Sequence, residues 1–299
     1  MKNPLTIFVS LFLVGTLSGT LTFIGGSPAV AQLGKPEGLY YKSWAIIIGI
    51  ENYIVAPPIP GAISDAKKVA QAFRRLGFDE VVELYDKDAS SRRLHQLLND
   101  MLPRKVGRMD RLVIFYVGHA GFTQDSDGQD RAFLVPFDAQ VNNAAKSITV
   151  EHLKEFTRRS ASKHTLLILD APVFGWETSA PPELSLEGRS TPESDTDRRA
   201  VQVIGAAGKG EAIVRVEKRS CFVEALLAGL SGLADLDKNG WLMASELGTY
   251  LVRQVEAASN GTQRPSSLRI DGDGDTALIE GRRSAFTLGA DPPTPSEQQ

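Results

Sequence analysis

The chain has 299 residues, of which 42% are hydrophobic and 23% are charged, so it can bury one substantial core or at most two. Its formal net charge of −3 argues against a nucleic-acid partner, because surfaces that bind nucleic acids are basic. The single cysteine excludes an internal disulfide, so the core must stabilise the fold without a covalent cross-link.

Residues 1–31 have the form of a secretory signal peptide. Lys2 precedes an apolar stretch from Leu5 to Ile24, and the small residues Ala29-Val30-Ala31 end the segment as a cleavage site requires. Cleavage before Gln32 leaves an exported chain, periplasmic or extracellular, with no stable membrane span. An uncleaved membrane anchor is the alternative, because the apolar stretch approaches the length of a transmembrane helix.

Between residues 32 and 283, apolar β-branched runs alternate with amphipathic helical patterns. This alternation predicts an α/β fold with a mostly parallel central sheet, helices on both of its faces, and chemistry at the carboxyl ends of its strands. In chain order, the strands are expected at 44–50, 81–85, 112–117, 166–169 and 201–204, and the helices at 65–76, 91–102 and 150–158.

Two of the expected strands deliver candidate site residues at their ends. The first leads into Gly118-His119-Ala120 and the second into Asp170-Ala171-Pro172, with 53 positions between His119 and Pro172. With the stretch Pro60-Gly-Ala-Ile-Ser-Asp65-Ala66, these segments resemble the caspase and metacaspase peptidases over roughly residues 43–279. That family places its catalytic histidine about 50 residues before its cysteine.

The resemblance implies that Pro172 stands where the nucleophilic cysteine belongs. Such a peptidase needs a thiolate, a histidine and backbone donors for the oxyanion. Proline has neither thiol nor N–H, and Ala120 replaces a glycine whose N–H is an oxyanion donor in the family. His119 is then the retained histidine of an inactive homologue, a pseudopeptidase with a binding or regulatory role.

The alternative is an active endopeptidase or other hydrolase that uses an unrecognised nucleophile. Cys221 is the only cysteine and begins a predicted helix, whose N-terminus can lower a thiol pKa. The resemblance matches this position to a small residue away from the catalytic loop. A structural role is therefore favoured for Cys221.

Acidic side chains line the specificity pocket of metacaspases, which cut after basic residues, and the matching positions here are Asp65 and Asp170. The resemblance therefore implies a protein or peptide partner with basic residues. Two structural roles compete with this one: Asp65 stabilises the start of its helix, and Asp170 accepts hydrogen bonds within its loop.

Residues 177–198 are rich in Ser, Thr, Pro and acids and are expected to form a mobile loop, which the resemblance aligns with the linker between family subunits. The tail from 284 to 299 is expected to be disordered.

The segment 235–246 satisfies every fixed position of an EF-hand calcium loop, and the helices expected at 221–233 and 244–258 flank it. Calcium would be bound by side-chain oxygens and, at the seventh position, a backbone carbonyl. The expected ligands are Asp235, Asp237, Asn239, Trp241 and Glu246. A capped turn between two helices is the alternative, and a calcium-responsive scaffold is a further possibility for the whole chain.

Overall fold

The structure is a computed structural model that describes residues 38–124, 126–172, 175 and 192–281. The predicted signal peptide at 1–31, the predicted tail at 284–299 and residues 177–191 of the predicted loop lie outside the described residues.

A six-stranded sheet forms the centre of the described domain, in the order β12-β8-β7-β3-β1-β2. Five of its strands run parallel, and β12 pairs with β8 in the antiparallel sense. The mostly parallel sheet predicted from the alternating pattern is therefore confirmed. The strands are β1 (Ser43–Gly49), β2 (Glu80–Tyr85), β3 (Arg111–Val117), β7 (His164–Pro172), β8 (Ala200–Ala207) and β12 (Ser266–Gly272).

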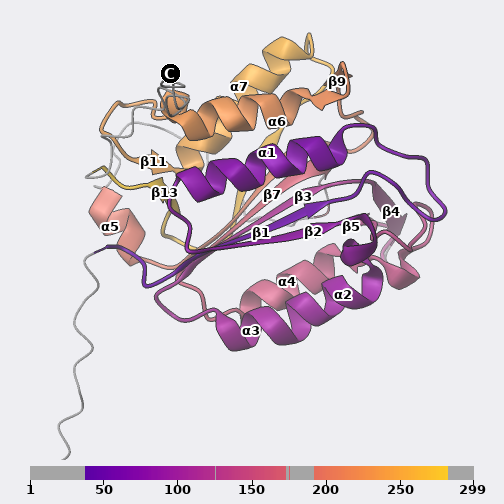
Figure 1. Ribbon diagram of the computed structural model, residues 1–299, viewed down its shortest axis with the longest axis horizontal. Coiled ribbons are helices and arrows are strands. Elements are labelled where there is room, and N and C mark those ends of the chain that lie inside the picture. The colour runs from indigo at the N-terminus through magenta and orange to yellow at the C-terminus, as the bar shows by residue number, and fades with distance from the viewer. Residues whose placement is uncertain (1–37, 125, 173–174, 176–191, 282–299) are drawn as a thin grey trace, which may run out of the picture. The chain divides into compact units, whose positions relative to one another are not determined.

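Helices cover both faces of this sheet, as Figure 1 shows. One face carries α1 (Ala62–Arg75), α6 (Cys221–Ala228) and α7 (Ala244–Ala258), and the other carries α2 (Ser91–Gln96), α3 (Leu102–Lys105) and α4 (Val150–Arg159). Alternate residues of a strand point to opposite faces. In β1, Ile46 and Ile48 accordingly pack in one core cluster, whereas Ala45 and Ile47 pack in the other.

Two of the predicted helices contain a π-helical turn. The turn at Leu97–Met101 joins α2 to α3, and the turn at Gly229–Leu233 extends α6. Short 3₁₀ turns lie at Asp86–Ala89 and Ala144–Lys146.

The structure also contains short strands that the sequence pattern did not predict. They are β4 (Ala120–Gln124), β5 (Asp130–Leu134) and β6 (Ile148–Thr149) in one small sheet, β9 (Arg215–Val216) with β10 (Arg219–Ser220), and β11 (Leu242–Met243) with β13 (Ala277–Ile279). Within the predicted loop 177–198, residues Pro192–Asp197 form helix α5, whose Thr196 is buried. Among the described residues, no helix combines the length and apolar character that crossing a membrane requires.

Candidate functional site

The parallel pairing of β3 with β7 brings the candidate residues His119 and Pro172 to one edge of the central sheet. Val117 lies opposite Asp170 in the register of the two strands. His119 and Pro172 each follow their paired residue by two positions, and both are partly exposed. The carboxyl ends of neighbouring parallel strands are where ligand sites form in α/β folds.

A cluster of tyrosine contacts fixes the backbone at His119. Its N–H donates to the Tyr53 hydroxyl at 2.8 Å, and its carbonyl accepts from the Tyr116 hydroxyl at 2.6 Å. A Cβ on Gly118 would lie 2.5 Å from the Tyr116 hydroxyl and 2.6 Å from that of Tyr53, so only glycine fits there. Nε2 of His119 lies 2.8 Å from the Pro57 carbonyl, which can only accept, so this nitrogen carries a proton and donates it.

Pro172 ends β7 just beyond an irregularity in the sheet. Leu169 pairs with Gly205 of β8, the register then shifts, and Pro172 pairs with Ala207. Ala120, which directly follows His119, begins β4 and pairs with Leu134 of β5. The chain therefore turns from the central sheet into the small sheet at this point.

The two predicted pocket acids, Asp65 and Asp170, lie together, and the guanidinium of Arg215 lies between them. Asp65 is in α1 and Asp170 is near the end of β7, and both side chains are fully buried. Nη2 of Arg215 forms an ion pair with Asp65 Oδ2, and its Nη1 lies 3.5 Å from Asp170 Oδ2. The buried pair Asp65 and Asp170, called the acidic pocket below after its expected role, therefore has an arginine of the same chain as its partner.

Ser220 connects both acids to helix α6. Its N–H donates to Asp65 Oδ2 at 3.1 Å and its hydroxyl donates to Asp170 Oδ1 at 3.0 Å. The same hydroxyl oxygen accepts from the Val223 N–H at 3.4 Å, which caps the helix. Asp65 thus bonds to residues of the β9–β10 hairpin. In the first turn of α1, the Ile63 N–H donates to Glu51.

Burial dominates the electrostatics of this pocket. Removal from water disfavours a charged carboxylate, and it raises the pKa of Asp170 to about 7 although Arg215 and Ser220 act in the opposite direction. Burial also raises the pKa of Asp65. When Asp65 and Asp170 are both ionised, the two carboxylates and the one guanidinium together carry a net negative charge.

Arg215 and Ser220 are the residues of this site that the sequence analysis missed. A serine directly before an apolar helical run is a recognisable helix cap, so the capping role of Ser220 was open to prediction. No local pattern pairs Arg215 with Asp65, because the two lie on segments far apart in the chain.

Cys221 follows Ser220 as the first residue of α6. Its pKa is raised, mainly by burial and also by the charges of Asp170 and Glu224. The helix N-terminus does not make this thiol more acidic, and the thiolate needed for nucleophilic attack is disfavoured.

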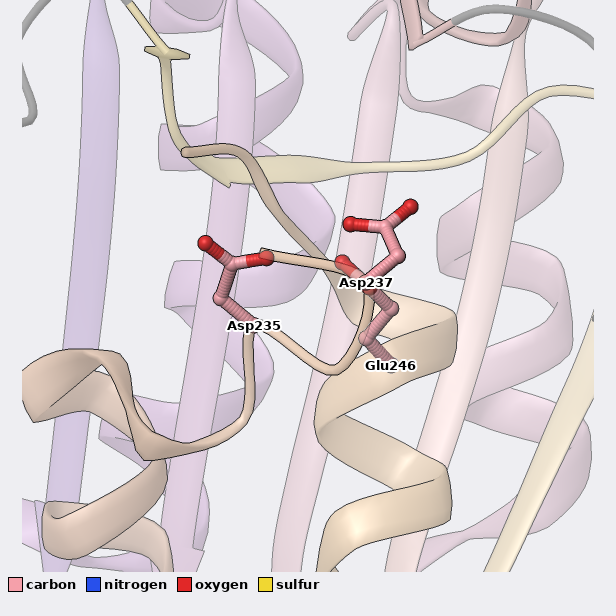
Figure 2. A group of neighbouring side chains, drawn as sticks. All are labelled: Asp235, Asp237 and Glu246. Carbon is pink, nitrogen blue, oxygen red and sulfur yellow. The ribbon is translucent and has the colours of Figure 1, made fainter. Parts of the chain in front are cut away.

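The segment 235–246 follows the π-helical turn and includes the first three residues of α7, and Figure 2 shows its three carboxylate side chains. Each of Asp235, Asp237 and Glu246 offers an oxygen within 4.8 Å of the others. Lys238 and Gly240 have positive φ angles of 56° and 83°, which produce the sharp turn. β11 follows the turn and pairs with β13, which ties the loop to the end of the domain.

Hydrogen bonds within the chain already order this loop. Asp235 accepts from the N–H groups of Asn239 and Gly240 at 3.2 and 3.0 Å. Glu246 is fully buried and accepts from Leu236 N at 3.3 Å and Met243 N at 3.1 Å. Carboxylate oxygens can each accept more than one partner, so the oxygens of Asp235, Asp237 and Glu246 are the atoms that could hold a cation here.

A comparison with protein-family models finds a match to the caspase domain over residues 42–270. The chain belongs to the caspase-domain family. The caspase-like resemblance and fold predicted from the sequence are therefore confirmed. The caspase-domain match spans all six strands of the central sheet apart from the last two residues of β12, and it includes Asp65, His119, Pro172 and Arg215.

Among solved structures, protein GSU0716 from Geobacter sulfurreducens is similar, with a TM-score of 0.54 and 15% sequence identity. The similarity covers 76% of this caspase-family chain and 93% of the other, and at this identity it shows a shared fold. No curated protein sequence matches.

Proposed function

We propose that this caspase-family protein binds a protein or peptide partner and does not cleave it. The observation that carries the proposal is Pro172 at the end of β7, next to the strand that leads into His119. A residue without thiol and without N–H supplies neither a nucleophile nor an oxyanion donor. Loss of one oxyanion donor alone costs about a hundredfold in rate or more.

The other side chains near this edge support the same proposal. The proton on His119 Nε2 is donated to a backbone carbonyl of the chain, and the raised pKa of Cys221 disfavours its thiolate. The acids Asp65 and Asp170 give the protein a site suited to a basic group. A predicted signal peptide at 1–31 supports export, to the periplasm or the extracellular space.

Peptidase assays with fluorogenic peptides that place Arg, Lys or Asp before the scissile bond test this proposal. The purified protein is expected to release no fluorophore above the buffer rate, and His119→Ala and Cys221→Ala are expected to match it. Turnover that disappears in either variant would establish the alternative, an active hydrolase. Pro172→Cys serves as the matched variant, because it restores both the thiol and the N–H at that position.

We also propose that the loop 235–246 binds one calcium ion. The proximity of three carboxylates and the fit of the spacing to an EF-hand loop support this. The backbone carbonyl of Trp241 and the side chain of Asn239 would complete the ligand set, with water at the position of Met243.

A further inference from the structure

Arg215 of the β9–β10 hairpin is less deeply buried than the two acids that it contacts. Arg215 retains 16% exposure, whereas Asp65 and Asp170 retain none. The tip of the hairpin is exposed, and 56% of Val216 is accessible. Arg215 therefore reaches both acids from a two-stranded segment with two residues in each strand.

The contacts of Arg215 in this pocket are incomplete. Among the buried side-chain atoms of the described residues, Asp65 Oδ1 and Arg215 Nε have no hydrogen-bond partner. A buried polar atom without a partner destabilises the folded state. Nη2 of Arg215 also donates to the Lys218 carbonyl at 3.1 Å, so the guanidinium is shared between the acids and its own hairpin. A guanidinium delivered from outside would be free of that constraint.

The turn of this hairpin is strained. Glu217 and Lys218 join the two strands with φ angles of 49° and 69°. Two positive φ angles define a type I′ turn, for which asparagine and glycine are the favoured residues. Residues with longer side chains are conformationally unfavourable at positive φ. The strain opposes docking of the hairpin and favours its release.

We propose that Arg215 is an internal ligand that closes the acidic pocket, and that a guanidinium group of a basic peptide binds Asp65 and Asp170 by displacing it. The inference rests on the proposed function, since it concerns the same pocket. The buried acids need a cationic partner, and a planar guanidinium can donate to both at once. An external arginine must therefore bind the two acids more favourably than the docked hairpin does.

Chemical complementation of Arg215→Ala tests the internal-ligand claim directly. Ethylguanidinium carries the head group that this variant lacks. At pH 8, ethylguanidinium is expected to raise the melting temperature of Arg215→Ala more than that of the parent, and the rise is expected to level off as its concentration increases. Arg219→Ala, which removes an exposed arginine of the same hairpin, is expected to respond like the parent, and Arg215→Ala with Asp170→Asn is expected to lose the response. An equal response in all four proteins overturns the proposal.

A short peptide with one arginine tests displacement. Calorimetry is expected to show at least tenfold tighter binding to Arg215→Ala than to the parent. The double substitution Glu217→Asn and Lys218→Gly suits the turn and is expected to bind more weakly than the parent, because the hairpin then docks more firmly. A merely structural role for the hairpin predicts no such weakening. Parent and Arg215→Ala binding the peptide equally well would overturn the internal ligand and leave the basic-partner proposal standing.

Complementation by ethylguanidinium without peptide binding to any variant would have the opposite meaning. The internal ligand would then be established and the basic partner rejected. If Arg215→Ala does not fold, hydrogen exchange in the parent replaces it. The amides of Ser220 and Cys221 bond to Asp65 and to Val214, so saturating peptide is expected to speed their exchange severalfold. Unchanged exchange at saturation would contradict displacement.

Discussion

Asp65 and Asp170, on a helix and on a strand of the central sheet, accept hydrogen bonds from the same guanidinium. This arrangement makes the stability of the domain depend on one residue of a short hairpin. It also leads to a pH dependence whose sign can be stated.

Arg215→Ala is expected to lower the free energy of unfolding by about 3–5 kcal/mol at pH 8, because it leaves buried carboxylates without their counter-ion. The loss is expected to shrink as the pH falls. A carboxyl whose folded pKa is raised, here to about 7 for Asp170, contributes stability below its unfolded pKa near 4 and loses it as the pH rises through 7. Urea unfolding of parent and variant at pH 5 and pH 8 measures this difference.

Among the described residues, Lys68 also acts on Asp65, and the uncharged Cys221 thiol lies within the influence of Asp170 and Glu224. A loss of equal size at both pH values would mean that the removal of Arg215 leaves the pKa values of the two acids unchanged. Arg219→Ala, at the exposed end of the hairpin, is the control and is expected to change the free energy of unfolding by less than about 0.5 kcal/mol.

Glu217→Asn with Lys218→Gly is expected to raise the free energy of unfolding by about 1–2 kcal/mol, because asparagine and glycine are better suited to the two positive φ angles of this turn.

Gly61→Ala is expected to act in the opposite direction and to lower the free energy of unfolding. Gly61 has a φ of 91°, and a Cβ there would lie 2.0 Å from the Lys218 carbonyl oxygen. Thermal melts of the two variants should move to opposite sides of the parent.

His164 is expected to make the fold sensitive to mild acid. It lies fully buried between the Tyr40 hydroxyl at 2.6 Å from Nδ1 and the Arg198 carbonyl at 2.8 Å from Nε2. The carbonyl requires a proton on Nε2, so Nδ1 accepts from Tyr40 in the neutral ring. Burial lowers the pKa of His164 to about 4.

The unfolded chain therefore binds a proton at this position that the folded chain does not. Its pKa is near 6.5 in the unfolded chain, so stability is present above pH 6.5 and falls toward pH 4, by about 3 kcal/mol in total. His164→Asn is expected to flatten this part of the stability profile, whereas His152→Gln, at an exposed histidine, is expected to retain it. Parallel profiles for parent and His164→Asn would contradict the prediction.

Calcium is expected to raise the melting temperature through the loop 235–246. A ligand that binds only the folded state at a hundredfold excess over its Kd adds about 2.7 kcal/mol. Asp237→Asn and Glu246→Gln are both expected to abolish the shift between calcium and chelator, and magnesium is expected to substitute poorly. Glu246 also accepts bonds from the backbone, so its variant is expected to melt lower even with chelator.

The exposed carboxylate of Asp237 gives the cleaner readout, since its replacement leaves the buried contacts of Glu246 in place. A calcium shift that survives both substitutions would locate the ion outside this loop. Identical melting with calcium and chelator in the parent would reduce the loop to a capped turn.

Strands β3 and β7 could be predicted from sequence, because the apolar runs Leu112–Val117 and Leu166–Leu169 carry a strong pattern. The helix Ala244–Ala258 was predicted to the residue. The β9–β10 hairpin could not be, because strands of two residues with charged side chains have no periodicity to detect. The acids Asp65 and Asp170 were predicted as a pair, but their occupant was not, since Arg215 reaches them through tertiary contact alone.

The pairing of β7 with β8 is irregular at the end of β7, where Pro172 lies. Because the register shifts between Leu169 and Pro172, the ladder with β8 is regular up to Leu169 and does not depend on an N–H at position 172. The regular part of the β7–β8 pairing is therefore separate from the residue at position 172. The residue at position 172 can therefore differ without a change in the pairing of β7 with β8 up to Leu169.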